Sequence, residues 1–371
     1  MLALTVAGAG MAGLAAAARA RELGITPIVL EKGDRPGGSM RLASCVVFRH
    51  RSLELFGQEC TDGDPVLQAR IVEELDDALA WLESLGAPVV ARKTGNPRTR
   101  GWRFDSRGLT DALVRAAGEV RLGTALPSDA GGPVVLATGG FAARLAAERG
   151  LGLRAHSWSD GGGLAFARAR GAALAGELEE FYGRALPAPP ARVGEADFVS
   201  ASQLYGRLAH VVDEAGEAFF PGEPTWSEAD LVQAVALRAG GIAWYVVDAR
   251  THRGRAVSGT VAEMVAAAEA LGGEVRRAGT VEGLGLGPLR SPKLVEPPFT
   301  AVKVRAAVTH TLGGLRIDER ARVLGEDGAP LEGLYAAGCD AGGIASGGYA
   351  SGLAAAVVFG RIAAETAAGV R

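Results

Sequence analysis

The chain has 371 residues, 48% of them hydrophobic, which is enough to bury a core without help from disulfides or metals. Its 39 Lys and Arg against 42 Asp and Glu give a net charge of −3, so it lacks the basic excess that neutralises nucleic-acid phosphates. The three cysteines form no CxxC pair and the histidines no HxxxH spacing, so no metal site is predicted. Unpaired cysteines and the lack of a signal-peptide or membrane-span pattern favour a cytoplasmic protein without a membrane partner.

The first predicted elements form a βαβ unit. Residues 2–7 and 26–30 are expected to be strands, and residues 13–23 the helix between them. Residues 6–13 have the sequence VAGAGMAG, and Glu31 ends the second strand. Such a glycine turn lets a pyrophosphate approach the helix N-terminus, while the acid accepts from ribose hydroxyls. The pattern therefore predicts a dinucleotide site, and the alternative is a purely structural glycine turn.

Further along, apolar residues recur at helical spacing between Ile71 and Leu85 and predict a helix over 65–85. Asp64 is the expected cap, a proline follows it, and Gly86 ends the helix. Residues 134–137 form the next expected strand, directly before a Thr-Gly-Gly turn.

The middle of the chain has a different texture. Residues 186–298 are rich in proline turns and contain an expected strand over 243–247 and an expected helix over 261–271. We therefore expect an inserted α+β domain at 186–298, within a first domain made by residues 1–185 and 299–371.

Three later motifs accompany the N-terminal turn. They are EKGDRPGGSM at 31–40, ATGGF at 137–141 and GLYAAGCD at 333–340. With these motifs the chain resembles the FAD-dependent oxidoreductases of the fumarate reductase, succinate dehydrogenase and 3-ketosteroid dehydrogenase superfamily. The resemblance implies an α/β fold: a doubly wound, Rossmann-like FAD-binding domain with an inserted capping domain.

The resemblance also implies which residues hold FAD. The glycine turn takes the pyrophosphate, the second glycine loop runs along the flavin, and the loop at 351–353 faces its pyrimidine end. The positions that match are Gly8, Gly10, Met11, Ala12, Gly13, Glu31, Lys32, Gly38, Ser39, Thr138, Gly139, Gly338, Asp340, Ser351, Gly352 and Leu353.

Two cofactor positions depart from the family pattern. Cys339 stands where the family has a glutamate that contacts the ribityl chain, so either Asp340 takes this role or the contact is absent. His50 lies farther from the glycine pair than the histidine that carries covalent FAD in some relatives. We therefore expect noncovalent FAD and a surface position for His50.

On the substrate side, residues 309–314 (THTLGG) resemble the family's HTxGG element, which makes His310 an active-site candidate. The alternative is a partly buried histidine that braces the loop. In the fumarate reductases one arginine donates the proton and a second clamps the substrate carboxylate. This chain has no arginine after residues 212–221, where the resemblance would place the first, and has Gly347 where it would place the second. A small dicarboxylate would lack both its charge clamp and its proton donor.

Aromatic residues stand in these substrate-side segments instead of the two arginines. Tyr349 lies in the loop that carries a substrate-polarising tyrosine in ketosteroid dehydrogenases, and Tyr182 and Tyr205 lie in or near the cap. Phenols suit an apolar ring that bears a carbonyl group, although ordinary packing is the alternative for each. We expect hydride transfer between flavin N5 and a C–C or C=C bond next to a carbonyl, with His310 and the three tyrosines as catalytic candidates.

Three other functions stay open at this stage. The chain could be a small-carboxylate reductase with cations from Arg184 or Arg207, a flavin oxidase or hydroxylating enzyme, or a non-catalytic flavoprotein partner. Because no second nucleotide unit or haem motif is present in the sequence, electrons are expected to pass through a diffusible carrier or oxygen.

Overall fold

The computed structural model describes residues 3–256 and 259–371. The chain divides into two compact units. The first unit contains the chain up to Arg144 together with Ala155–Phe181 and His310–Arg371, and the second contains Leu145–Arg154 and Tyr182–Thr309. The first unit is thus built from both ends of the chain.

A six-stranded sheet forms the centre of the first unit, in the order β18-β19-β7-β1-β2-β6. All neighbours are parallel except β18, which is antiparallel to β19. β1 has β2 on one side and β7 on the other, so the strand order reverses beside β1. Open α/β sheets bind their ligands outside the carboxyl ends of the strands at such a reversal. The strands are β1 (Ala3–Ala7), β2 (Thr26–Leu30), β6 (Val120–Arg121), β7 (Val134–Leu136), β18 (Arg322–Leu324) and β19 (Pro330–Ala336). The predicted Rossmann-like βαβ unit is confirmed.

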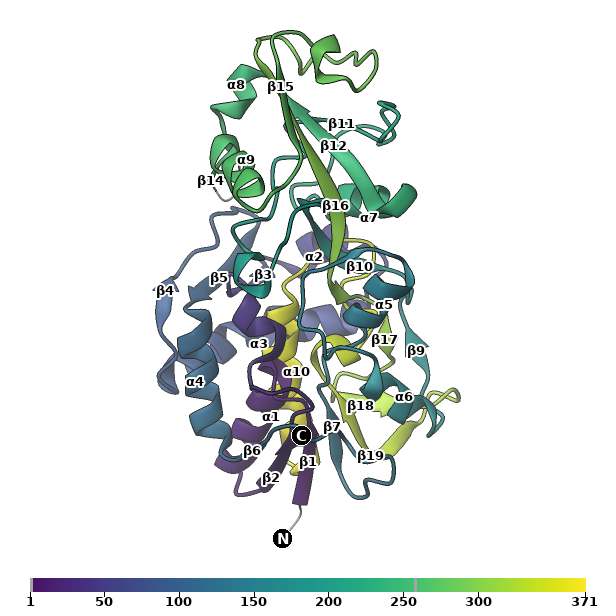
Figure 1. Ribbon diagram of the computed structural model, residues 1–371. Coiled ribbons are helices and arrows are strands. Elements are labelled where there is room, and N and C mark those ends of the chain that lie inside the picture. Colours follow the sequence, from purple (N-terminus) through teal and green to yellow (C-terminus); the bar gives the residue numbers. More distant parts are fainter. Residues whose placement is uncertain (1–2, 257–258) are drawn as a thin grey trace. The chain divides into compact units, whose positions relative to one another are not determined.

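Helices α1 (Met11–Glu22) and α10 (Gly352–Ala367) lie side by side although they come from opposite ends of the chain (Figure 1). Small residues make the approach close: a Cβ atom at Gly360 would lie 2.4 Å from the Ala12 carbonyl oxygen. The other helices of this unit are α2 (Leu53–Glu59), α3 (Pro65–Ser84), α4 (Ser106–Ala117) and α6 (Gly162–Arg168), and α5 (Ala142–Glu148) crosses into the second unit.

Helix α3 begins as its sequence predicts. The Asp64 carboxylate accepts the N–H groups of Val66 and Leu67 at 2.8 and 3.3 Å, and Pro65 occupies the first turn, where its missing N–H costs nothing. Two small sheets complete the first unit. They contain β3 (Val46–His50), β4 (Val89–Ala91) and β5 (Thr99–Phe104) in one, and β9 (Leu174–Ala175) with β17 (Gly314–Leu315) in the other.

The second unit has its own sheet and core. Its main path is β10-β16-β12-β11, and β15 and β8 also pair with the long strand β16. Trp244, Val246 and Phe299 belong to its buried cluster. Its strands are β8 (Gly152–Leu153), β10 (Phe181–Pro187), β11 (His210–Val212), β12 (Ile242–Val247), β13 (Arg255–Ala256), β14 (Gly259–Thr260), β15 (Val275–Ala278) and β16 (Phe299–Thr311). Its helices are α7 (Ala229–Ala236), α8 (Ala249–His252) and α9 (Val261–Ala270).

None of the helices within the described residues combines the length and apolar character that a membrane crossing requires. Over the same residues, no group of three or more His, Cys, Asp or Glu side chains is arranged to hold a metal ion.

Candidate cofactor and active site

The turn between β1 and α1 uses its three glycines for different purposes. A Cβ atom at Gly8, where φ is +105°, would lie 2.1 Å from the Ala137 carbonyl oxygen, and one at Gly13 would lie 1.9 Å from the Gly8 carbonyl oxygen. Neighbouring backbone atoms therefore leave no room for a side chain at Gly8 or Gly13. A Cβ atom at Gly10 would meet nothing within 4 Å, so Gly10 alone faces open space at the N-terminus of α1. This is the arrangement that brings the backbone close to a pyrophosphate.

Glu31 is fixed beside this turn. It is 7% exposed, and its two carboxylate oxygens accept the N–H groups of Ala9 at 2.8 Å and Gly33 at 2.7 Å. An ionised carboxylate has about four acceptor positions, so these bonds leave room for two further donors. The hydroxyls of a ribose are donors of the required kind.

A second glycine loop runs along the first. The Gly37 N–H donates to the Ala9 carbonyl at 2.7 Å, and a Cβ atom at Gly38 would lie 3.3 Å from the Gly10 Cα. The Ser39 hydroxyl oxygen accepts the His156 N–H at 3.3 Å. The predicted cofactor positions Gly10, Gly38 and Ser39 are therefore brought together.

Asp340 ties two strand ends to each other. It is 1% exposed and accepts from the Thr138 hydroxyl at 2.9 Å, from the Thr138 N–H, and from the Gly140 N–H at 3.3 Å. Burial raises the pKa of Asp340 above its usual value, although these donors lower it. In the structure its carboxylate thus supports the turn at Thr138 and Gly139. A contact with the ribityl chain stays a prediction.

Gly338, in the segment 333–340, packs against the first turn of α1. Its φ is +66°, and a Cβ atom there would lie 3.1 Å from the Ala12 Cβ. Met11 and Ala12 are buried in the first turn of α1, at 3% and 5% exposed. Lys32, by contrast, pairs with the Asp160 carboxylate near the surface.

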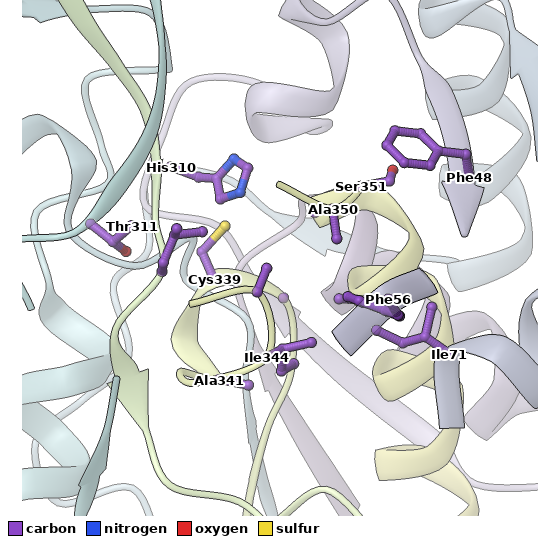
Figure 2. A pocket seen from close by; sticks show the side chains of 15 residues that line it. Phe48, Phe56, Ile71, His310, Thr311, Cys339, Ala341, Ile344, Ala350 and Ser351 are labelled. Carbon is purple, nitrogen blue, oxygen red and sulfur yellow. The ribbon is translucent and has the colours of Figure 1, made fainter. Parts of the chain in front are cut away.

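A pocket opens where α10 begins (Figure 2). Its lining comes from the end of β16, from the segment around Cys339, from the α10 N-terminus and from the aromatic rings of Phe48 and Phe56. Most of these side chains are apolar, and His310 is the only ionisable side chain besides the Cys339 thiol among the described residues that line it. Burial raises the pKa of Cys339 to about 12, so it is a neutral thiol at neutral pH.

Helix α10 presents its N-terminus to this pocket. Ser351 caps the helix: its hydroxyl donates to the Val46 carbonyl at 3.2 Å and accepts the Ala354 N–H at 3.4 Å. Gly352 and Leu353 follow in the first turn, where N–H groups have no intrahelical partner and carry partial positive charge. The His310 ring lies against this turn, since a Cβ atom at Gly352 would be 3.2 Å from its Nε2 atom.

Tyr349 lies next to the pocket lining. Its ring contacts Phe48 with 5.6 Å between centroids, and its carbonyl oxygen lies 3.2 Å from Nε2 of His50. The expected surface position of His50 is wrong: its side chain is fully buried, and its ring packs on Phe56 with 4.9 Å between centroids. The flanking arginines suggest solvent, but His50 ends β3 on the strand's buried face.

The other two tyrosine candidates belong to the second unit. Tyr182 is 7% exposed and has the Arg184 guanidinium 4.8 Å from its ring centroid. Tyr205 is fully buried, and its ring packs on Tyr245 with 5.6 Å between centroids. Burial raises the pKa of Tyr205. Their roles as substrate contacts stay predictions.

The loop that contains Gly347 disfavours a side chain at that position. Gly347 has a φ of +79°, and a Cβ atom would lie 2.6 Å from an Asp62 carboxylate oxygen and 2.7 Å from the Thr61 hydroxyl oxygen. The Gly347 N–H donates to the Glu180 carboxylate at 2.8 Å. Burial raises the pKa of Glu180, and the nearby charge of Asp62 raises it further. Two carboxylates therefore lie where the family resemblance would place an arginine.

Comparisons with known proteins agree with this geometry. A family model described as "FAD binding domain" matches residues 106–353, two thirds of the chain, and one described as "NAD(P)-binding Rossmann-like domain" matches residues 6–47. The NADH:fumarate oxidoreductase of Klebsiella pneumoniae is 26% identical over 98% of this chain and 47% of its own length. The chain thus spans about half of that relative.

Two solved structures share the fold over nearly the whole chain. The open form of a flavocytochrome c3 fumarate reductase has a TM-score of 0.73 at 22% identity, covering 99% of this chain and 78% of that one. The 3-ketosteroid delta1-dehydrogenase from Sterolibacterium denitrificans has a TM-score of 0.74 at 18% identity, covering 100% of this chain and 99% of that one. At these identities the likeness establishes the fold.

The residues present fit FAD. Open space at Gly10, spare acceptor positions on Glu31 and an apolar pocket at a helix N-terminus all lie within the first unit. The sequence places Asp160 in a predicted helix cap before α6, but it does not indicate that His156, Trp158 and Asp160 contact the Glu31–Ser39 loop. The signal for these contacts was an isolated tryptophan in a small-residue loop directly before α6.

Proposed function

The chain belongs to the FAD binding domain family and takes FAD as its cofactor, and on this premise we propose that it is an oxidoreductase acting on a CH–CH group. The bond it acts on lies next to a carbonyl in an apolar, cyclic substrate. FAD, when bound, supplies the acceptor or donor of the hydride at N5.

One observation carries the choice of substrate: the contacts of Gly347. A guanidinium that clamps a substrate carboxylate needs a side chain. The positive φ of Gly347 disfavours one, and the Thr61 and Asp62 side chains would have to move aside to admit it. The Asp62 and Glu180 carboxylates would repel a substrate carboxylate brought near the Gly347 loop. A neutral substrate avoids this repulsion, and the apolar lining of the pocket favours its burial.

The chain's own residues then have distinct tasks. The Gly10 turn and Glu31 hold the adenosine diphosphate half of the cofactor, while the first turn of α10 stabilises negative charge at the other end. His310, which lines the pocket, donates a hydrogen bond to the substrate carbonyl. Tyr349 is proposed to assist the proton transfer that accompanies hydride transfer. Substrate contacts by Tyr182 and Tyr205 stay predictions, since both side chains are buried within the second unit.

The electron partner belongs to the same proposal. A diffusible carrier or oxygen would exchange electrons with the cofactor in a second half-reaction. A cytoplasmic location, suggested by the free cysteines Cys45, Cys60 and Cys339, is part of this proposal as well.

A small-carboxylate reductase is the second candidate, because the relative from Klebsiella pneumoniae that matches 98% of this chain carries the name fumarate oxidoreductase. It would need a cation from elsewhere, such as Arg184 or Arg207. In the second unit the Arg184 guanidinium donates to the Ser227 carbonyl, whereas the Arg207 bond to the Glu228 carboxylate, at 3.1 Å, is made by its backbone N–H. The Arg184 guanidinium is thus already engaged within that unit.

Ligand titration of the oxidised protein separates the two candidates. Binding beside a flavin perturbs its visible absorption, so cyclic ketones and succinate can be compared without turnover. We expect a saturable change with the ketones and none with succinate, and the reverse result would favour the carboxylate reductase. His310→Gln should weaken ketone binding, whereas Gly57→Ala, a change at an open helical position, should leave it unchanged.

A further inference from the structure

An exposed tryptophan lies beside the acid that follows β2. Trp158 is 42% exposed, which is unusual for so large an apolar side chain. A Cβ atom at Gly33 would lie 2.7 Å from Cδ1 and 2.8 Å from Nε1 of Trp158, and 3.1 Å from a carboxylate oxygen of Glu31. The edge of the indole therefore covers the bare backbone of Gly33, next to the Glu31 carboxylate.

The backbone on both sides of Trp158 is tied to the same loop. After it, the Asp160 carboxylate pairs with the Lys32 ammonium group. Before it, the His156 N–H donates to the Ser39 hydroxyl oxygen at 3.3 Å, and the Trp158 N–H donates to Nδ1 of His156 at 3.2 Å. These contacts fix the backbone on both sides of Trp158 before any ligand binds, which reduces the entropy cost of using its indole as a contact surface.

Glu31 indicates which part of a ligand would lie next to the Trp158 ring. Its carboxylate already accepts the N–H groups of Ala9 and Gly33 and keeps acceptor positions for ribose hydroxyls. A purine attached to that ribose needs an aromatic or apolar wall close to the acid. Trp158 offers such a wall, with a large part of its surface still open to a ligand.

We propose that Trp158 forms the contact surface for the adenine ring of FAD, positioned by the Lys32–Asp160 ion pair. This role belongs to the cofactor's adenosine half. It depends on FAD binding and is independent of the substrate, so it stands even if the proposed ketone chemistry fails.

The test compares the binding of FAD with that of FMN, which lacks the adenosine half. Dissociation constants of the purified full-length protein are measured from flavin fluorescence after dilution and ultrafiltration, for the wild type, Trp158→Ala and Trp158→Phe. Trp102→Ala is the matched control, since it removes an indole at a different position of the same unit. Thermal unfolding of each variant checks the fold.

Loss of aromatic stacking predicts that Trp158→Ala weakens FAD binding by about 10-fold or more, while FMN binding changes by less than about 2-fold. Trp158→Phe keeps an aromatic face and should stay within about 3-fold of the wild type for FAD, as should Trp102→Ala. Unchanged FAD binding in Trp158→Ala, or an equal loss for FAD and FMN, would overturn the proposal. If Trp158→Ala does not fold, Trp158→Leu replaces it, with the same expected loss and the same contradicting results.

Discussion

The His310 imidazole lies directly against the first residue of α10: a Cβ atom at Gly352 would be 3.2 Å from both Cε1 and Nε2 of the ring. This distance is tighter than most Cβ contacts in proteins, so a larger residue at position 352 would require the His310 ring to shift by a few tenths of an ångström. The glycine at the helix start and the histidine at the end of β16 thus depend on each other.

Gly352→Ala should therefore impair turnover without unfolding the protein. Alanine is well tolerated in a first helical turn, but the His310 ring must shift by a few tenths of an ångström, so turnover should fall measurably without being lost. Steady-state kinetics with flavin content measured in parallel provide the check. Gly57→Ala, in α2 with no atom within 4 Å of the added Cβ, is the control with unchanged turnover. Unchanged turnover in Gly352→Ala would contradict a dependence of catalysis on this position of the His310 ring.

The first glycine turn makes a paired prediction. Gly13→Ala should lower the free energy of unfolding by about 3 kcal/mol, because its Cβ atom would overlap the Gly8 carbonyl. Gly10→Ala should leave that free energy nearly unchanged but weaken FAD binding by about 10-fold or more, the loss of about 1.4 kcal/mol at the ligand. Chemical denaturation of the flavin-free form and a flavin-binding assay distinguish the two. Equal effects of both variants on stability would contradict the packing described here.

Asp340 provides a third prediction. Its carboxylate accepts from Thr138 and Gly140 in a fully buried place, and an asparagine would offer one acceptor oxygen and aim its amide donors at backbone donors. Asp340→Asn should therefore destabilise the protein by about 2 kcal/mol and lower FAD retention. Asp77→Asn, at an exposed position of α3, should change stability by less than about 0.5 kcal/mol. The account fails here if both variants melt at the same temperature.

His50 makes stability depend on pH. Burial lowers the pKa of His50 below its ordinary value of 6.5, so the folded protein keeps this ring neutral. The stability is therefore fully present above pH 6.5 and falls as the pH drops toward the lowered pKa, because the unfolded chain takes up the proton first. His50→Gln keeps a donor for the Tyr349 carbonyl and does not titrate. Urea unfolding at pH 7.5 and 5.5 should show a smaller loss for His50→Gln than for the wild type.

The sequence predicts local features well because their causes are local. The turn around Gly10 follows from the spacing of its glycines, and the start of α3 follows from Asp64 and the proline after it. His50 was misplaced because its charged neighbours point elsewhere: Arg49 pairs with Asp76, and Arg51 donates to the Pro97 carbonyl.

The features that the sequence could not predict depend on contacts between distant residues. Glu180 lies 167 positions from Gly347, and no local pattern indicates that its carboxylate binds this loop. The same holds for Trp158, whose position beside Glu31 depends on how the segment before α6 returns to the end of β2. The contacts of Glu180 and Trp158 can therefore be recognised only in the folded structure.

The reoxidation of the photoreduced protein under anaerobic conditions tests the central claim most directly. Reduced protein is mixed in a stopped-flow instrument with a panel of cyclic enones and, separately, with fumarate, and the return of the oxidised flavin absorption is followed. We predict fast, saturable reoxidation by at least one enone and, with fumarate, a rate no greater than that of the blank. Reoxidation by fumarate as fast as by any enone would contradict the account, because the loop with Gly347, Asp62 and Glu180 would then accept a dicarboxylate.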